Sequence, residues 1–235
     1  MTGRPAPVVL PPLLRAWLGP IAALATLMVI VLGVRYAGRG RPGMVDAWIQ
    51  PAVDGVRSPW RHVALATDFL GEPVGAAALV VAVVAGCLLL RCPRAAVFVV
   101  AGAGLAVGTA TLLKSLVGRS IHGEDNLSYP SGHTAFLTAL TLAVALFAVG
   151  RLGLGRAAGT LLVLAAALVA GAVMGWAQVA LGAHYPTDVL GGWCTALAVT
   201  PATGWLVDRT ADRLVARTAG RAAGRAADAG REERS

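Results

Sequence analysis

The hydrophobic positions of the chain gather in six long runs, and most polar positions lie between these runs. The runs cover about residues 17–34, 74–90, 95–113, 132–149, 157–180 and 187–206. Each is roughly long enough for a helix that crosses the ~30 Å hydrocarbon core of a bilayer. The pattern predicts an all-α fold, a polytopic membrane bundle of six transmembrane helices.

The first run follows a polar, proline-rich leader, residues 1–16, that carries Arg4 and Arg15. A secretory signal peptide has a similar charged start. Here the apolar run is longer than the apolar part of a typical signal peptide, and no small-residue cleavage site follows it. We therefore expect an uncleaved first span.

The segment from 35 to 73 is more polar, but apolar residues recur within it at helical spacing. They are Met44, Val45, Trp48, Ile49, Ala52, Val53 and Val56. Such a stripe is typical of a helix in the membrane interface, here bent near Pro51. A helix packed over the end of the bundle explains the stripe equally well.

The composition agrees with a membrane protein: 57% of the residues are hydrophobic, 14% are charged and the mean hydropathy is +0.70. A soluble domain carries about 25% charged residues. We expect one membrane domain, residues 17–206, and a basic cytoplasmic tail, residues 207–235. The net charge of +8 invites a nucleic-acid partner, but the apolar content leaves no basic soluble face, so we expect none.

The basic residues predict the orientation in the membrane. With both termini inside, the internal segments hold 13 of the 20 basic residues and the external segments hold seven. This bias towards the cytoplasm places the loops at 114–131 and 181–187 outside. Within the tail, arginines recur every four residues from Arg209 to Arg225, which is typical of a solvated helix or of a ridge on anionic headgroups.

Three cysteines, Cys87, Cys92 and Cys194, lie in or beside the apolar runs without a CxxC pair or metal-ligand spacing. They are expected to be small packing residues. No metal and no cofactor is expected.

The candidate chemistry begins with the segment Pro130 to His133, directly before an apolar run. Ser131 is a natural helix N-cap, and the unpaired N–H groups after it can bind an anion. Gly132 allows a close approach of the backbone, which leaves His133 facing that anion. Taken alone, the segment is equally explained by a simple cap with a surface histidine.

A second polar segment, His184 to Asp188, opens the last run. The spacing of four residues lets the Asp188 carboxylate reach one imidazole nitrogen of His184, which leaves the other nitrogen as a nucleophile. A capping aspartate beside a solvated histidine is the alternative. Lys114 is the only lysine of the chain, and its compact ammonium suits a phosphate; Arg119 follows with a fork-shaped group.

Three segments therefore occur in a fixed order: KSLVGR from Lys114 to Arg119, YPSGH from Tyr129 to His133, and LGAHYPTD from Leu181 to Asp188. Together they resemble the type 2 phosphatidic acid phosphatase family, which also contains glucose-6-phosphatases and vanadium haloperoxidases. The resemblance covers about residues 60–206. It implies a helical bundle with six spans in the membrane members, and a phosphohistidine mechanism without a metal.

By this resemblance His184 attacks phosphorus and Asp188 orients it. His133 protonates the leaving alcohol and then helps to activate water. The groups that hold the phosphoryl oxygens are Lys114, Ser131 and the Gly132 N–H.

Two positions depart from the family pattern. The family pattern has an arginine seven residues after the lysine, where this chain has Ile121, and His122 follows it in the usual proline position. The pattern also has an arginine six residues before the nucleophile, where this chain has Gln178, and Ala177 precedes it in place of a serine. A hydrogen bond to a charged group is worth roughly 1.5–3 kcal/mol. Each loss therefore costs about 10- to 100-fold in transition-state binding. Phosphate contacts from Arg119, Gln178 and His122 are the expected compensation.

The sequence thus predicts a phosphatase of a membrane lipid phosphate or polyprenyl diphosphate, with its site on the outer face of a bacterial plasma membrane. The alternative is a weakened relative that binds phospholipid headgroups without efficient turnover. A transporter is disfavoured because the informative polar residues lie at span ends, away from mid-membrane.

Overall fold

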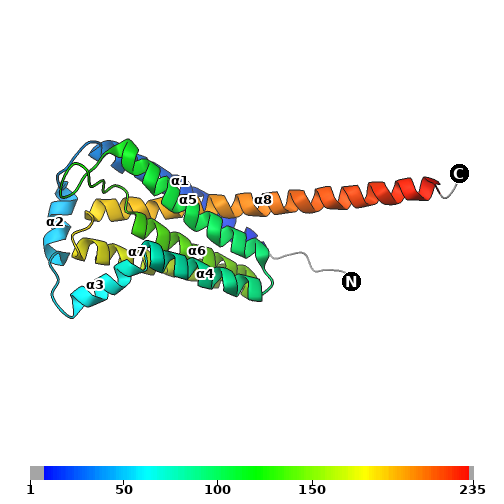
Figure 1. Ribbon diagram of the computed structural model, residues 1–235, viewed down its shortest axis with the longest axis horizontal. Helices are drawn as coiled ribbons and strands as arrows, with labels where there is room; N and C mark the ends of the chain where they lie inside the picture. The colour runs from blue at the N-terminus through cyan, green and yellow to red at the C-terminus, as the bar shows by residue number, and fades with distance from the viewer. Residues whose placement is uncertain (1–7, 233–235) are drawn as a thin grey trace.

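A computed structural model describes residues 8–232, with side chains to residue 221, and this region is helical (Figure 1). After a 3₁₀ turn, Pro12–Leu14, come α1 (Arg15–Tyr36), α2 (Met44–Val53), α3 (Trp60–Phe69), α4 (Pro73–Leu89), α5 (Pro93–Val117), α6 (Gly132–Leu152), α7 (Arg156–Ala180) and α8 (Pro186–Glu232). The described residues hold no strand, only one bridge between Ser120 and Leu127. The predicted all-α class is confirmed.

The local sequence explains where the helices begin. Pro73, Pro93 and Pro186 each open a helix at its first position, where the missing N–H costs nothing. At α6 the Ser131 side chain accepts a hydrogen bond from the Thr134 N–H at 3.4 Å. The cap predicted at Ser131 is therefore present, and it fixes the start of the helix that carries His133.

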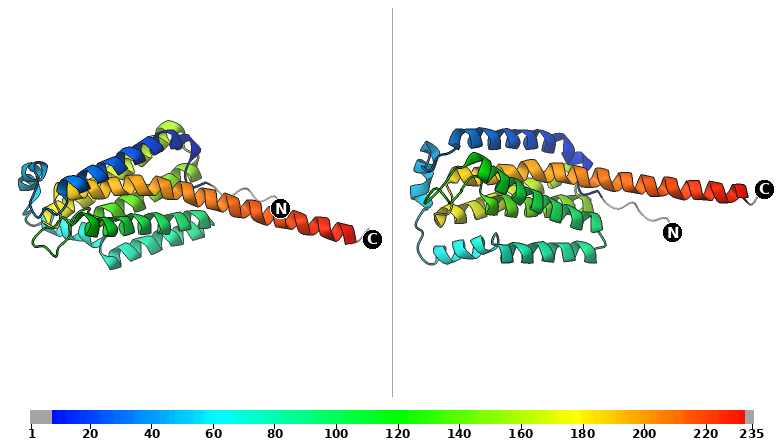
Figure 2. Two further views of the ribbon diagram at one scale, coloured as in Figure 1. Left: turned by 90° about the horizontal axis from the view of Figure 1, so that it is seen from above. Right: turned by 45° about the horizontal axis from the view of Figure 1, so that its top comes forward.

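The long helices lie side by side and run between two ends of the molecule (Figures 1 and 2). Helix α6 packs against α5, α7 and α8, and 61% of its most apolar stretch is buried, compared with 22% for α1. Many residues between the helices are alanines, which let backbones approach closely in membrane bundles. Examples are Ala106, Ala139 and Ala196, all buried where α5, α6 and α8 meet.

Four helical segments are long and apolar enough to cross a membrane: α1 with its preceding turn, α5, α6 and α7. Helices α3 and α4 are bent by 63° and would together make a fifth span. The predicted count of six spans is not confirmed. The sixth predicted span is the first half of α8, where Asp188, Thr195 and Pro201 interrupt the apolar residues.

Helix α2 lies across one end of the bundle, against α7 and α8. Its apolar stripe faces mainly outwards, since Met44 is 89% and Trp48 is 82% exposed, whereas Asp46 points inwards and is fully buried. Helix α2 therefore packs over the bundle, but through the side that carries Asp46, so packing on the bundle does not explain the apolar stripe. The following α3 was not predicted, because its ten residues mix apolar and polar positions without a long apolar run.

The segment predicted as a separate tail from residue 207 continues α8 without a break. Helix α8 extends far beyond the bundle, on the side where α1 begins (Figure 1). Residues 212–221 on this extension are exposed. This arrangement agrees with the solvated helix expected from the spacing of the arginines.

Candidate active site

The three predicted segments meet at the end of the bundle opposite the start of α1, where α5 and α7 end and α6 and α8 begin (Figure 1). The Ser131 N–H donates to the backbone oxygen of Asp188 at 2.9 Å, which joins the starts of α6 and α8. A side chain at position 192 would overlap the Ser131 backbone, so Gly192 permits this close contact. His122 Nε2 lies 2.8 Å from the Gly182 oxygen and links the same two connections, α5–α6 and α7–α8, a second time.

His184 and Asp188 are both buried, at 7% and 0% exposure. His184 Nδ1 lies 3.8 Å from Asp188 Oδ2. This is longer than a hydrogen bond, as is common in active sites before a substrate binds. The same carboxylate oxygen accepts the Tyr185 N–H at 3.0 Å. Asp188 is thus placed to orient the His184 ring through Nδ1, and Nε2 is left for chemistry.

The pKa of His184 is lowered from its ordinary value, mainly because burial disfavours the charged imidazolium. Asp188 opposes this shift through its hydrogen-bonding position and its charge, while Lys114 and His133 add to it electrostatically. Both groups are therefore close enough to act on His184 electrostatically. A lowered pKa keeps the ring neutral, the form that a nucleophile requires.

Arg119 lies in a buried network that holds Asp188. Its guanidinium is 0% exposed and donates to Asp188 Oδ1, Asp46 Oδ2 and Thr187 Oγ1, each at 2.6 Å. Its carbon also lies 4.0 Å from the centre of the Tyr36 ring and 4.5 Å from that of the Tyr185 ring. This geometry supports a positioning role for Arg119, and the phosphate contact expected for it stays a prediction.

Asp46 completes that network from α2. Its carboxylate accepts the N–H and hydroxyl of Thr187 at 2.9 and 2.8 Å, and the Gly43 N–H at 2.9 Å. Two carboxylates and one arginine are thus fully buried and paired with one another, while the Arg119 Nε–H has no hydrogen-bond partner among the described residues. The start of α8, which carries Asp188, is fastened to both α2 and the loop after α5.

Lys114 lies in the last turn of α5 and is partly buried. Ser131 is fully buried and Gly132 begins α6, so its N–H is one of the unpaired donors of a helix start. These groups lie along the same connection from the end of α5 to the start of α6 that carries Arg119 and His133. The phosphate contacts predicted for Lys114, Ser131 and Gly132 remain predictions, which this placement supports.

His133 faces two carboxylates that the sequence reading missed. Its Nε2 lies 3.6 Å from both Asp68 Oδ1 and Glu72 Oε1. Gly71, in the bend between α3 and α4, packs directly on the His133 ring, where a side chain would overlap it. His133 is therefore oriented by the α3–α4 bend as well as by its own helix.

Gln178, at the position of a missing arginine, is 1% exposed and donates from Nε2 to Asp68 Oδ1 at 2.6 Å. Its backbone oxygen accepts the N–H groups of Ala183 and His184. It thus supports the carboxylate beside His133, and its predicted phosphate contact stays untested. Ile121 and Ala177 are buried, at 3% and 0% exposure.

Asp68, Glu72 and His133 each offer one ligand atom, and these atoms lie within 4.8 Å of one another. Carboxylate oxygens and an imidazole nitrogen are suitable ligands for a divalent cation. Glu72 is half exposed, however, and carboxylates near a histidine commonly occur without a metal. The arrangement can hold a cation or can simply orient His133.

Two signals in the sequence were available for these carboxylates. Asp46 lies within the expected helix but off its apolar stripe, and an acid on the side that packs against the bundle needs a buried partner. Asp68 and Glu72 are four residues apart, directly before an apolar run, where a charged pair at membrane depth marks a functional site. Neither signal names the partner, because the partners lie far away in the sequence.

The comparisons with known proteins identify the family of the chain. The family model described as the PAP2 superfamily matches residues 16–211. The crystal structure of a transmembrane PAP2-type phosphatidylglycerolphosphate phosphatase from Bacillus subtilis is similar, with a TM-score of 0.63 and 23% sequence identity over 82% of this chain and 96% of that chain. A search of curated proteins found no match. The protein is an integral membrane protein of the PAP2 superfamily.

Proposed function

We propose that this protein is a membrane phosphatase that releases phosphate from a lipid phosphate or polyprenyl diphosphate through a phosphohistidine on His184. The observation that carries the proposal is the buried pair of His184 and Asp188, within electrostatic reach of His133 and Lys114. Membership of the PAP2 superfamily supports the same chemistry. The phosphatase activity named for the similar Bacillus subtilis protein is consistent with it.

In the first step His184 Nε2 attacks phosphorus, and the bond to the lipid oxygen breaks. Asp188, at Nδ1, stabilises the positive charge that develops on the ring. His133 gives its proton to the leaving oxygen. The three other phosphoryl oxygens gain charge and are held by Lys114, Ser131 and the Gly132 N–H.

In the second step water attacks the phosphohistidine. His133, now neutral, takes a proton from that water, and the bond between phosphorus and His184 Nε2 breaks. Inorganic phosphate leaves and His184 is regenerated. No metal is needed in this sequence, which makes activity in the presence of a chelator part of the proposal.

We further propose six spans: the four long apolar helical segments, the bent α3–α4 pair, and the first half of α8. That half of α8 packs against α1, α5 and α6, where a span would lie. Both termini then share the cytoplasmic side, and the histidines face the outer side of a bacterial plasma membrane. Lipid headgroups reach the loops from the bilayer, and water reaches them from outside.

The test is phosphate release by the purified full chain in detergent with excess EDTA. The substrates are a phosphatidate, a phosphatidylglycerol phosphate and a polyprenyl diphosphate. His184→Ala is expected to reduce release by at least 10³-fold, the order of loss when a nucleophile is removed. His62→Ala is the matched control, because His62 is exposed on α3. Full activity of His184→Ala would disprove the nucleophile.

A second function is favoured by one observation: Ile121 and Gln178 stand where the family has arginines, and Gln178 is bonded to Asp68. In this alternative the protein binds phospholipid headgroups without efficient turnover. Restoring both arginines, Ile121→Arg with Gln178→Arg, separates the two. If the wild type is nearly inactive and the double variant gains 10-fold or more in phosphate release, the alternative is supported. If the wild type is already fast and the double variant gains nothing, the phosphatase is supported.

A further inference from the structure

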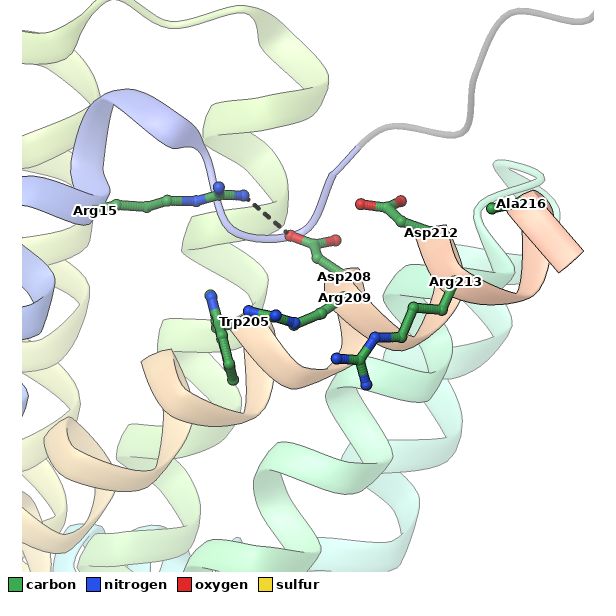
Figure 3. A pocket seen from close by; sticks show the side chains of 7 residues that line it. All are labelled: Arg15, Trp205, Asp208, Arg209, Asp212, Arg213 and Ala216. Atoms are coloured by element: carbon green, nitrogen blue, oxygen red, sulfur yellow. Dashed lines mark ion pairs between the residues drawn. The ribbon is translucent and has the colours of Figure 1, made fainter.

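Two adjoining cavities lie at the end of the bundle opposite the histidines. The first, which we name the α8 pocket, has a volume of about 410 Å³ and is shown in Figure 3. It is lined by Arg15, Trp205, Asp208, Arg209, Asp212, Arg213 and Ala216. The second, the apolar groove, has a volume of about 360 Å³ and is lined mostly by apolar residues of α1 and α8. The two share Arg15 and Trp205.

The two carboxylates of the α8 pocket already have partners. Asp208 is 3% exposed and accepts the N–H groups of Val9 and Leu10, with Arg94 at 3.3 Å and Arg15 at 3.7 Å. Asp212 pairs with Arg94 at 2.8 Å. The acids of the pocket therefore fasten α8 to α5 and to the start of the chain.

Arg209 and Arg213 differ from these paired groups. They are exposed one turn apart on α8, and neither has a carboxylate partner among the side chains described, residues 8–221. The Arg209 guanidinium lies 4.9 Å from the centre of the Trp205 ring, beside the mouth of the apolar groove. Two guanidinium groups thus remain available for an anion next to an apolar channel.

The depth of the pocket fits the headgroup region of a bilayer. The ends of the long helices on this side carry the arginines Arg15, Arg91, Arg94, Arg151 and Arg156. Arginine and tryptophan are typical of the membrane–water interface, and Trp205 is 44% exposed there. A molecule in both cavities would place its charged part among the arginines and its chain along α1 and α8.

We propose that the α8 pocket and the apolar groove together bind one anionic glycerophospholipid from the leaflet on the side where α1 begins. Arg209 and Arg213 contact its phosphate and headgroup, and one acyl chain lies in the groove. This site is separate from the proposed catalytic site at the other end of the bundle. It does not depend on the phosphatase proposal.

The test is native mass spectrometry of the full chain in a mild detergent with added dioleoyl phosphatidylglycerol or dioleoyl phosphatidylcholine. The pocket variant is Arg209→Gln with Arg213→Gln. The control is Arg217→Gln with Arg221→Gln, which removes the same charge from the same helix outside the pocket. Each arginine near an anionic headgroup is worth about 1 kcal/mol, so phosphatidylglycerol binding should fall at least about fivefold in the pocket variant only.

A third variant tests the acyl-chain part of the site without changing charge. Gly19 lines the apolar groove and has open space where a side chain would begin, so Gly19→Leu adds apolar bulk at the groove. It should also weaken phosphatidylglycerol binding. Equal losses in the pocket variant and its control, equal binding of both lipids, or unchanged binding in all variants would overturn the proposal.

Discussion

At the scale of single residues, the proposed chemistry depends on how buried charges are placed around His184. Its ring is buried, which favours the neutral form. Asp188 lies beside Nδ1, where its carboxylate can stabilise the charge that forms during attack. The roles of His184 and Asp188 follow from their spacing of four residues. The direction of the Arg119 side chain does not follow from the sequence, because its partners Asp46 and Asp188 are 73 and 69 positions away.

The lowered pKa of His184 gives a pH dependence. The nucleophile must be neutral, so the acidic limb of kcat/KM should lie below the ordinary histidine pKa of about 6.5. Asp188→Asn removes an interaction that raises this pKa, so the limb should move to still lower pH while the rate falls. The measurement is a pH–rate profile, with His62→Gln as the control. An acidic limb at or above pH 6.5 that Asp188→Asn does not move would contradict this assignment.

The same shift affects stability. In the unfolded chain His184 takes up a proton at a pH where the folded protein leaves it neutral. Stability therefore decreases as pH falls through the ordinary value and levels off below the folded pKa. Between the ordinary pKa and the folded pKa of His184, the thermal unfolding midpoint of the wild type should fall with decreasing pH more than that of His184→Gln. Above the ordinary pKa the two midpoints should depend on pH in the same way.

At the scale of helices, the sequence predicted the long elements well and the short ones poorly. The ends of the six apolar runs lie within a few residues of α1, α4, α5, α6, α7 and the start of α8, because proline and capping residues mark them. Helix α3 was missed since it has no long apolar run. The inward side of α2 was missed because the apolar stripe faces outwards while Asp46 faces the bundle.

Helix α2 has a specific task in this account: Asp46 holds Arg119 and the start of α8. Asp46→Asn keeps the shape but removes a buried charge, and removing one partner of a buried ion pair costs about 3–5 kcal/mol. We expect a lower midpoint of thermal unfolding in detergent and a reduced kcat, with KM little changed. Asp54→Asn, at the exposed end of the same helix, is the control. Equal behaviour of both variants would show that the network is dispensable.

At the scale of the whole molecule, the bundle separates two ends with different chemistry. The histidines and carboxylates lie at one end, and the arginine-rich helix ends, the α8 pocket and the α8 extension lie at the other (Figures 1 and 3). The sequence predicted this separation from the arginines between the runs. It could not establish the number of spans, because the α3–α4 bend and the polar residues of α8 obscure two of them.

The proposed orientation can be checked with a membrane-impermeant maleimide on intact cells. Glu124→Cys lies in the exposed loop before α6, and Arg217→Cys lies on the exposed extension of α8. The three native cysteines are buried and give little background. We expect labelling of Glu124→Cys without lysis, and of Arg217→Cys only after lysis. The reverse pattern would invert the topology, and labelling of both before lysis would exclude six spans.

The most direct test of the account is to find the phosphoryl group on the enzyme during turnover. The full chain is mixed with a lipid phosphate, quenched in alkali, where phosphohistidine survives, digested and sequenced by mass spectrometry. We expect phosphate on His184 in the wild type and none in His184→Ala. In His133→Ala the phosphate on His184 should increase if the hydrolysis of the phosphohistidine slows more than its formation. Rapid turnover with phosphate on another residue, or sustained turnover by His184→Ala, would contradict it.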